Sequence, residues 1–187
     1  NIKFSDFPLV ALFSKEMDMP AENVKIGNDA NLAALGEAVA GAAKGASSSV
    51  MITLGTGVGG GVILDGKMLM GCAFGGAELG HTVIELNGRQ CSCGRKGCFE
   101  AYCSATALVK LTKEKFEATS GTLMHEMCEN DVNRVGGKTA FAAMKKGDKA
   151  GAEIVDAYIS YLACGVANLI NIFQPEVFTI GGGVSGE

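Results

Sequence analysis

The strongest constraint on the fold is a glycine-rich segment, LGTGVGGGVILDG, which runs from Leu54 to Gly66. It matches the G-x-G-x-x-G pattern of dinucleotide-binding turns at Gly55, Gly57 and Gly60. Those turns need a helix directly after the glycines, whereas this segment continues with branched apolar residues and an Asp-Gly hairpin signal. A Lys-Ser or Lys-Thr pair is also missing, which excludes a Walker A loop. The segment therefore predicts two antiparallel strands joined by a glycine turn.

The predicted turn has Thr56 at its tip. Glycines allow backbone N–H groups to approach phosphate oxygens closely, and a threonine hydroxyl adds a further donor. The turn is therefore either a phosphate-binding hairpin or an ordinary tight hairpin that requires positive φ angles. Five glycines in seven residues favour the phosphate hairpin, because one Asn-Gly pair would suffice for an ordinary turn.

A second constraint is a loop that concentrates metal-binding residue types, namely His81, Cys91, Cys93 and Cys98. Zinc takes four soft or borderline ligands in a tetrahedron, and this set supplies them without leaving an open position. A metal held here would therefore be structural. Reduced buried cysteines and a redox pair are the alternatives, and clustering in a chain of cytosolic character favours a metal. The remaining cysteines are expected to fill the core: Cys72, Cys103, Cys128 and Cys164.

Asn28 and Asp29 directly precede a segment with helical spacing of small apolar residues. Both residue types are favoured helix caps, so capping is one interpretation. The other is a general base at a strand-to-helix junction, where a carboxylate can project into a cleft. The two interpretations are compatible, with one residue serving each role.

The order of predicted elements is typical of an α/β fold. Helical periodicity in the segment 149–173 is apolar along most of its length, which predicts a largely buried helix. Other expected elements are a short helix before Pro20, a short strand in 23–30, a helix over 30–45 capped by Gly45, strands in 46–69, irregular structure over 71–97, helices in 98–118 and 138–148, and a buried strand in 175–186.

Composition narrows the classes of partner. The net charge is −4 and no basic block occurs, which predicts no nucleic-acid partner for this segment. No uninterrupted apolar run reaches the length of a membrane span, so we expect no membrane partner and a cytoplasmic location. The chain begins at Asn1 and stops soon after a glycine turn, and we expect both ends to lie within a longer protein.

Several motifs occur together: NDANLAALGE, LGTGVGGG, AELGH, CSCGRKGCFE and PEVFTIGGG. In this combination the chain resembles the ROK family of sugar kinases and sugar-responsive repressors, and most of all its bacterial ATP-dependent glucokinases. The likeness runs from about Phe7 to the end of the chain. It implies an α/β fold of the actin-like ATPase, ribonuclease-H-like type, with two domains around an active cleft.

The resemblance also implies a domain division. Residues 1–45 would be the C-terminal tail of the small α/β domain, and 46–187 the large domain, incomplete at its C-terminal end, with a structural zinc loop. The first phosphate motif of the family, an Asp-x-Gly-x-Thr hairpin, is absent from the chain. We therefore expect a fragment of a kinase with little or no activity alone.

Roles for single residues follow from the resemblance. Asp29 would be the catalytic base that takes the proton from the 6-hydroxyl of the sugar. Sugar contacts are implied for Asn28, Asp29, Glu78, His81 and Glu100, and ATP contacts for Gly55, Thr56, Gly57, Gly181, Gly182 and Gly183. The implied ligands of a structural Zn²⁺ are His81, Cys91, Cys93 and Cys98, with His81 facing the sugar through its second ring nitrogen.

The function implied for the parent protein is transfer of the γ-phosphate of ATP, bound with Mg²⁺, to a hexose, with glucose as the first candidate. The alternative is the sugar-sensing domain of a ROK-type transcriptional repressor. A repressor needs no catalytic carboxylate, so the intact N-D-A-N and glycine motifs favour the kinase. Members of the family are commonly dimers or tetramers, which implies a homo-oligomer.

Overall fold

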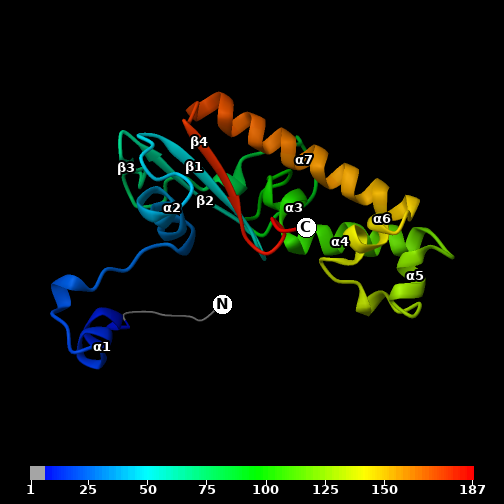
Figure 1. Cartoon of the computed structure of the whole chain (residues 1–187), viewed down its shortest axis with the longest axis horizontal. Coiled ribbons are helices and arrows are strands. Elements are labelled where there is room, and N and C mark those ends of the chain that lie inside the picture. Colours follow the sequence, from blue (N-terminus) through cyan, green and yellow to red (C-terminus); the bar gives the residue numbers. More distant parts are fainter. Residues whose placement is uncertain (1–6) are drawn as a thin grey trace.

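The computed structural model describes residues 7–187, and within them one mixed β-sheet forms the centre of the molecule (Figure 1). Its strand order is β3-β2-β1-β4. Strands β1 and β2 pair antiparallel through the predicted hairpin, and β4 pairs with β1 in parallel. The strand bounds are β1 Ser49–Leu54, β2 Val58–Leu64, β3 Lys67–Met68 and β4 Val177–Gly181.

In the sequence, α1 and α2 precede the sheet, and the other helices lie between β3 and β4. In space, α2 packs on β1 and β2. The longest helix, α7, runs from Lys149 to Phe173 and leads directly into β4 (Figure 1). The remaining α-helices are α1 Leu9–Glu16, α2 Asp29–Ala40, α3 Glu100–Cys103, α4 Ala105–Ala118, α5 Leu123–Met127 and α6 Thr139–Lys145. Three 3-10 turns complete the set: η1 Ala21–Asn23, η2 Leu79–His81 and η3 Val132–Arg134.

The glycines of β2 allow neighbouring elements to approach both faces of the sheet. A Cβ atom on Gly61 would overlap the Ala34 side chain of α2, and a Cβ on Gly59 would overlap Ala30. Between them, Gly60 faces the opposite way, where a Cβ would overlap Leu79 of η2. Side chains alternate across a strand, so one face of β2 receives α2 and the other receives η2. These glycines therefore serve packing, a reason that the sequence pattern alone did not reveal.

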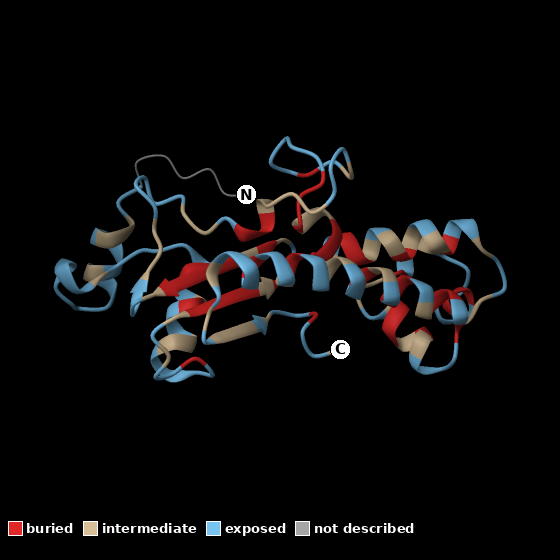
Figure 2. Cartoon of the chain, turned by 90° about the horizontal axis from the view of Figure 1, so that it is seen from above, coloured by how far each residue is buried: buried red, intermediate tan, exposed pale blue. Residues whose placement is uncertain are grey.

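The core continues from the sheet into the helical half of the molecule. Strand β1 contributes Val50, Ile52 and Leu54, which have almost no exposed surface. They belong to one cluster with residues of α3, α4 and α7, including Tyr102 and Tyr158. Figure 2 shows the buried residues concentrated in these strands and helices, whereas α1 contains none.

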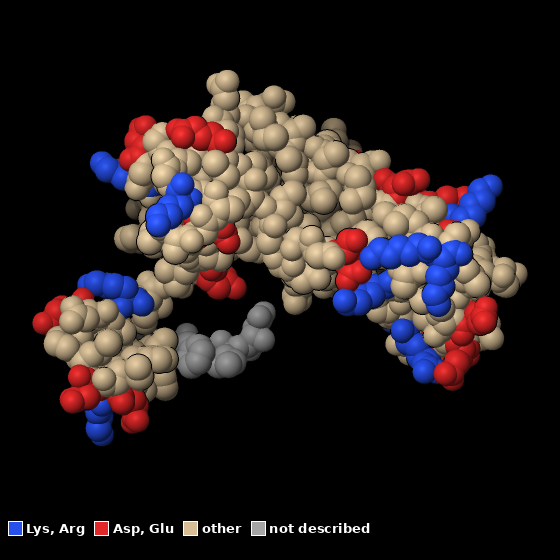
Figure 3. All heavy atoms as spheres, in the orientation of Figure 1, with Lys and Arg blue, Asp and Glu red and all other residues tan. Residues whose placement is uncertain are grey.

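Charged side chains on the face seen in Figure 3 lie mainly at the two ends of the molecule, with acidic and basic groups side by side. The middle of that face is mostly uncharged.

Two expectations from the sequence stay predictions. They are the absence of a nucleic-acid partner and the division of the chain at residue 45.

Two predicted elements differ from the structure. The expected strand in 23–30 is wrong: residues 24–28 are not paired in the sheet, which among the described residues contains only β1 to β4. The helix expected to reach Gly45 ends at Ala40. A Glu37 side-chain oxygen accepts a hydrogen bond from the Ala42 N–H at 2.7 Å and so helps to end α2 one turn early.

The expectation that the segment 149–173 is largely buried is also wrong. Only 28% of the most apolar 18-residue window of α7 is buried, and Ile159, Ile170 and Ile172 are exposed. Helix α7 packs on α3, α4 and α6, and these contacts leave several of its apolar side chains exposed. By length and composition α7 could cross a membrane, although core helices of soluble proteins pass the same test. Strand β4, expected to be buried, is half-buried.

The four cysteines outside the loop were expected in the core, and the structure divides them. Cys103 and Cys128 are buried, whereas Cys72 and Cys164 are exposed.

His125, to which the sequence assigned no role, is buried beside Phe116, with the ring centroids 3.9 Å apart. A histidine in a polar sequence segment thus belongs to the core, because its ring nitrogens find hydrogen-bond partners there.

Candidate functional site

The turn between β1 and β2 is anchored to the start of α4. The Gly55 N–H donates to the Gly57 carbonyl at 3.0 Å and closes the turn. The Gly55 carbonyl accepts from the Ala105 N–H at 2.8 Å, and the Thr56 carbonyl accepts from the Thr106 hydroxyl at 2.8 Å. Thr56 itself is exposed at the tip. The backbone of the turn is thus anchored on α4, while Thr56 at its tip stays exposed, as a phosphate-binding turn requires.

Asn28 and Asp29 divide the two roles considered for them. Asn28 is the N-cap of α2, and its side-chain oxygen accepts a hydrogen bond from the Asn31 N–H at 3.1 Å. Asp29 is the first residue of the helix, and its carboxylate accepts from the Ala30 N–H at 2.9 Å. A negative side chain is favourable at this end of a helix. Asp29 is exposed, so its carboxylate is available to a ligand.

An open hollow of about 360 Å³ brings most of the predicted sugar- and ATP-binding residues together. The start of α2 and the β1–β2 turn form two of its walls, and further polar side chains come from the end of β1, from η2 with the residue before it, and from α3. The predicted site residues that border it are Asp29, Gly55, Thr56, Gly57, Glu78, His81 and Glu100. A carboxylate, a glycine turn and further polar side chains thus face one space.

A smaller hollow of about 80 Å³ lies beside the first, with Asn28, Asp29 and Glu78 on its walls. It is also lined by Phe74, which is 79% exposed and has a φ of 60°. Phe74 was not singled out in the sequence. An aromatic residue inside a short glycine-rich segment, CAFGG, is the sequence signal that could have found it.

Two polar residues of β1 and α2 were also missed. Thr53 borders the larger hollow and is the polar residue of an otherwise apolar stretch, MITL. Asn31 lines the smaller hollow, is 5% exposed, and its side-chain oxygen has no hydrogen-bond partner among the described residues.

The second predicted ATP-binding segment, Gly181 to Gly183, lies near the turn but outside the hollow. Gly181 pairs with Thr53 at the carboxyl ends of two parallel strands, the edge at which α/β sheets bind ligands. Gly182 has a φ of 97° and packs against the backbone of Leu54, where a Cβ has no room. Gly183 follows in the open, and none of the three glycines borders the hollow that contains Asp29.

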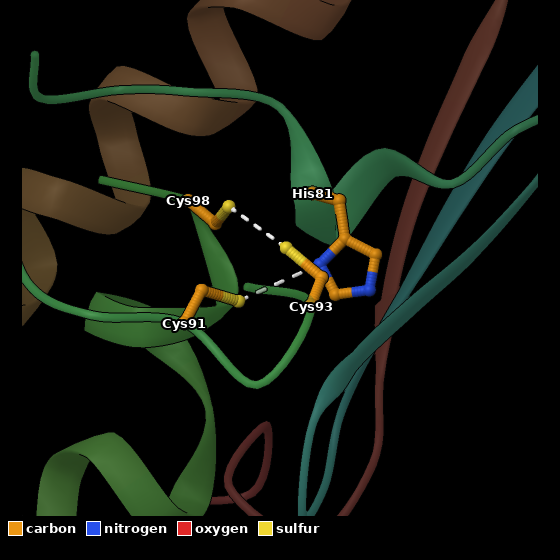
Figure 4. A group of neighbouring side chains, drawn as sticks. All are labelled: His81, Cys91, Cys93 and Cys98. Atoms are coloured by element: carbon orange, nitrogen blue, oxygen red, sulfur yellow. Dashed lines mark hydrogen bonds between the residues drawn. The ribbon is translucent and has the colours of Figure 1, made fainter. Parts of the chain in front are cut away.

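The four predicted metal ligands form one cluster (Figure 4). The Cys93 and Cys98 sulfur atoms are 3.6 Å apart, and the Cys91 sulfur is 3.7 Å from Nδ1 of His81. All four donor atoms lie within 4.8 Å of one another. Tetrahedral coordination with metal–sulfur bonds of about 2.3 Å requires separations of about 3.5–3.8 Å, which the two close pairs match. The residues therefore fit a metal ion.

The second ring nitrogen of His81 lies on the far side of the ring from the sulfur atoms in Figure 4. His81 also borders the larger hollow. The ring therefore connects the cysteine cluster with the space beside Asp29.

The thiols of the cluster differ in their acidity. Burial raises the pKa of the Cys98 thiol to about 12, with the neighbouring thiols adding to the rise. A backbone N–H of Arg95 lowers the pKa of Cys93, which is exposed. Each of the seven cysteines is a free thiol. A cation that binds these sulfur atoms would have to displace the proton from a buried thiol.

Comparison with known proteins places this site in a family. The model of the ROK family matches residues 1–187. The chain is 40% identical over 182 residues to a glucokinase of Thermotoga maritima, and it is 32% identical over 181 residues to a xylose repressor of Caldicellulosiruptor bescii. These matches cover 97% of the chain in both cases, 57% of the glucokinase and 44% of the repressor.

Among solved structures, the fold is similar to that of a ROK family glucokinase from Streptomyces griseus, determined in complex with glucose and AMPPNP. The TM-score is 0.85 at 34% identity, over 100% of the chain and 59% of the glucokinase. The chain thus spans little more than half the length of these kinases. The mixed sheet and this neighbour fit an actin-like ATPase fold. The chain belongs to the ROK family.

Proposed function

We propose that the chain is part of a kinase that transfers the γ-phosphate of ATP to the 6-hydroxyl of a hexose, with glucose as the first candidate. One observation carries the proposal: the Asp29 carboxylate and the Gly55–Gly57 turn border the same hollow. Phosphoryl transfer to an alcohol needs a base for the hydroxyl proton and donors for the phosphate charge, placed within reach of one another. Glucokinases among the relatives support the same reaction.

In the proposed reaction, Asp29 accepts the proton of the 6-hydroxyl while that oxygen bonds to the γ-phosphorus. The bond from the γ-phosphorus to the β–γ bridging oxygen breaks, and ADP leaves with that oxygen. Backbone N–H groups of Thr56 and Gly57 would stabilise the phosphate charge, and Mg²⁺ would accompany the ATP. Gly181, Gly182 and Gly183 would lie near the adenosine. Their place at the same sheet edge as the turn supports this assignment.

Sugar hydroxyls would be recognised by Asn28, Glu78, His81 and Glu100, together with Asp29. Four of these five residues border the larger hollow, and Asn28 borders the smaller one with Asp29 and Glu78. Carboxylate and imidazole groups accept hydrogen bonds from hydroxyls and so distinguish sugars by the positions of those hydroxyls. The glucose-bound neighbour supports glucose as the acceptor.

The metal that we propose for the cysteine cluster is zinc, held by His81, Cys91, Cys93 and Cys98. The three sulfur donors and one imidazole are a donor set that zinc prefers, and the spacing of the donor atoms supports tetrahedral binding. With four protein ligands, zinc would supply structural stability to the loop. His81 would then be fixed in orientation for its contact with the sugar.

A sugar-sensing domain of a repressor is the second candidate function, since a xylose repressor is also among the relatives. The two functions differ in their need for Asp29, because a sensor only has to bind the sugar. The carboxylate beside a phosphate-type turn favours the kinase. We further propose a cytoplasmic homo-oligomer for the parent protein.

The test is a panel of hexoses and xylose with ATP, applied to the complete protein that contains this chain. Formation of ADP with glucose above all other sugars is the expected result. Sugar binding without ADP formation would favour the sensor. The chain by itself is expected to show little or no turnover, because it lacks an Asp-x-Gly-x-Thr phosphate motif.

A further inference from the structure

The Glu100 carboxylate joins two segments that are far apart in the sequence. One oxygen, Oε2, accepts a hydrogen bond from the Val58 N–H at 3.1 Å. The other, Oε1, accepts from the Ser92 hydroxyl at 2.8 Å. Val58 is the first residue of β2, directly after the glycine turn, and Ser92 belongs to the cysteine loop. Both oxygens of one carboxylate are therefore engaged in a bridge.

The contact with the turn is close. A Cβ atom on Gly57 would overlap the Oε2 atom of Glu100, so the carboxylate lies directly against the turn. Glu100 is the first residue of α3, and the preceding Cys98 and Phe99 are fully buried. The backbone that carries Glu100 is thus held in the core, and its side chain extends from there to the turn.

Ser92 lies between two of the candidate metal ligands, Cys91 and Cys93. The Cys91 sulfur is itself 3.8 Å from the Oε1 atom of Glu100. Ser92 is exposed, so outside the bridge its position depends on the two neighbouring ligands. An ion bound by Cys91 and Cys93 would hold the Ser92 backbone on both sides.

We infer that Ser92 and Glu100 are positioning residues that connect the metal loop to the phosphate turn. The inference rests on the proposed kinase function. A loop closed on its metal holds Ser92 at Glu100, and Glu100 holds the Val58 N–H at the end of the turn. Loss of the metal therefore loosens the grip on ATP as well as the sugar site. This adds to Glu100 a task beyond its proposed sugar contact.

The test uses the complete, metal-loaded protein with Ser92→Ala, and Ser92→Thr as the variant that keeps the hydroxyl. Removal of one hydrogen bond predicts a KM for ATP raised about two- to tenfold in Ser92→Ala, with recovery in Ser92→Thr. Bound metal per chain is expected to stay the same in both variants. Ser160→Ala, an exposed serine on α7 away from the site, is the control.

A second measurement does not depend on turnover. Hydrogen exchange of the Val58 amide should accelerate in Ser92→Ala, and also in the wild type after removal of the metal by a chelator. Glu100→Gln should keep the amide protected, because an amide oxygen can accept from Val58 while its NH₂ donates to the Ser92 hydroxyl. In Glu100→Asp the side chain is too short to reach both Val58 and Ser92, so the Val58 amide should lose its protection.

The outcomes separate the inference from the proposed function. A wild-type protein that phosphorylates no hexose contradicts the proposed function, and the Val58 exchange then still tests the bridge. An active wild type with unchanged KM for ATP and unchanged Val58 exchange in Ser92→Ala overturns the inference alone. A loss of bound metal in Ser92→Ala also overturns it, since the serine would then only support the loop.

Discussion

The Asn28 side-chain oxygen caps α2 by accepting the Asn31 N–H at 3.1 Å, and Asp29 follows as the first residue of the helix. The N-cap hydrogen bond of α2 therefore comes from Asn28 and not from Asp29. Asp29 borders both hollows and is exposed, and its carboxylate accepts a hydrogen bond only from the adjacent Ala30 N–H among the contacts of the described residues. Two adjacent polar residues thus have separable tasks, and substitutions can distinguish them.

Asp29→Asn in the complete protein should remove phosphoryl transfer and leave sugar binding. An amide cannot accept the hydroxyl proton, so we expect kcat to fall about 100- to 10,000-fold. Asn28→Ser, which keeps a capping oxygen, is the matched variant for helix stability. Steady-state kinetics and calorimetric titration with glucose would measure the two effects. Near-normal turnover of Asp29→Asn would show that another group acts as the base.

Removal of one sulfur donor should release the metal. We expect about one zinc ion per chain in the wild type and a clear loss in Cys93→Ser, with a lower Tm, because binding energy of a structural metal contributes to folding. Cys164→Ser is the control, since that cysteine is exposed and outside the cluster. Elemental analysis and thermal unfolding measure both quantities. Equal stability of a metal-free wild type would exclude the structural zinc.

Gly61→Ala should destabilise the fold, whereas Gly36→Ala should not. The new methyl group on Gly61 would overlap Ala34 and push α2 from the sheet, at a cost of about 1–3 kcal/mol. The same change at Gly36, on the exposed side of α2, meets nothing within 4 Å and should stabilise the helix by about 0.5–1 kcal/mol. Urea unfolding of both variants checks the difference. Equal shifts would contradict the packing role of Gly61.

Asp148 should give the protein stability that is lost in acid. Burial favours the neutral carboxyl, but backbone N–H groups of Gly151, Leu123, Met124 and Ala150 outweigh it and lower the pKa of Asp148. Its contribution to the unfolding free energy is therefore complete above the unfolded pKa of about 3.9. It disappears as the pH falls through the lower folded pKa.

The substitution Asp148→Asn tests this effect. The amide nitrogen cannot accept from the Met124 N–H, so we expect a loss of about 1 kcal/mol at pH 7. The difference from wild type should shrink as the pH falls below the unfolded pKa of about 3.9. Asp131→Asn, an exposed cap of η3, is the control. A deficit that stays constant between neutral and acid pH would contradict the assignment to the charge.

Sequence periodicity predicted the hairpin and the helices α4, α6 and α7 because their apolar patterns repeat over many residues. It did not predict which side of α7 is covered, since Ile159, Ile170 and Ile172 look like core residues until the neighbours are known. The strand expected in 23–30 failed for a related reason. A strand needs a partner, and pairing is a property of the sheet and not of the segment.

Local spacing brought the cysteine cluster together correctly, because Cys91, Cys93 and Cys98 lie within one short loop. The convergence of Asp29 with His81 and Glu100 in one hollow followed from the family resemblance, since these residues are far apart in the chain. Contacts such as Ser92 with Glu100 could not be predicted, because they depend on side-chain rotamers across a folded interface.

The glycines at 57, 59, 60 and 61 limit which codon changes this segment of the gene can accept without a change in packing. Their missing Cβ atoms would point at Glu100, Ala30, Leu79 and Ala34, so each glycine is required by a different neighbour. Every glycine codon has two fixed bases, and any missense change in them adds a Cβ. Third-position changes in these codons are therefore silent, whereas a missense change adds a Cβ against one of these neighbours. A second substitution that makes room for such a Cβ would have to lie in α2, η2 or α3, depending on which glycine is changed.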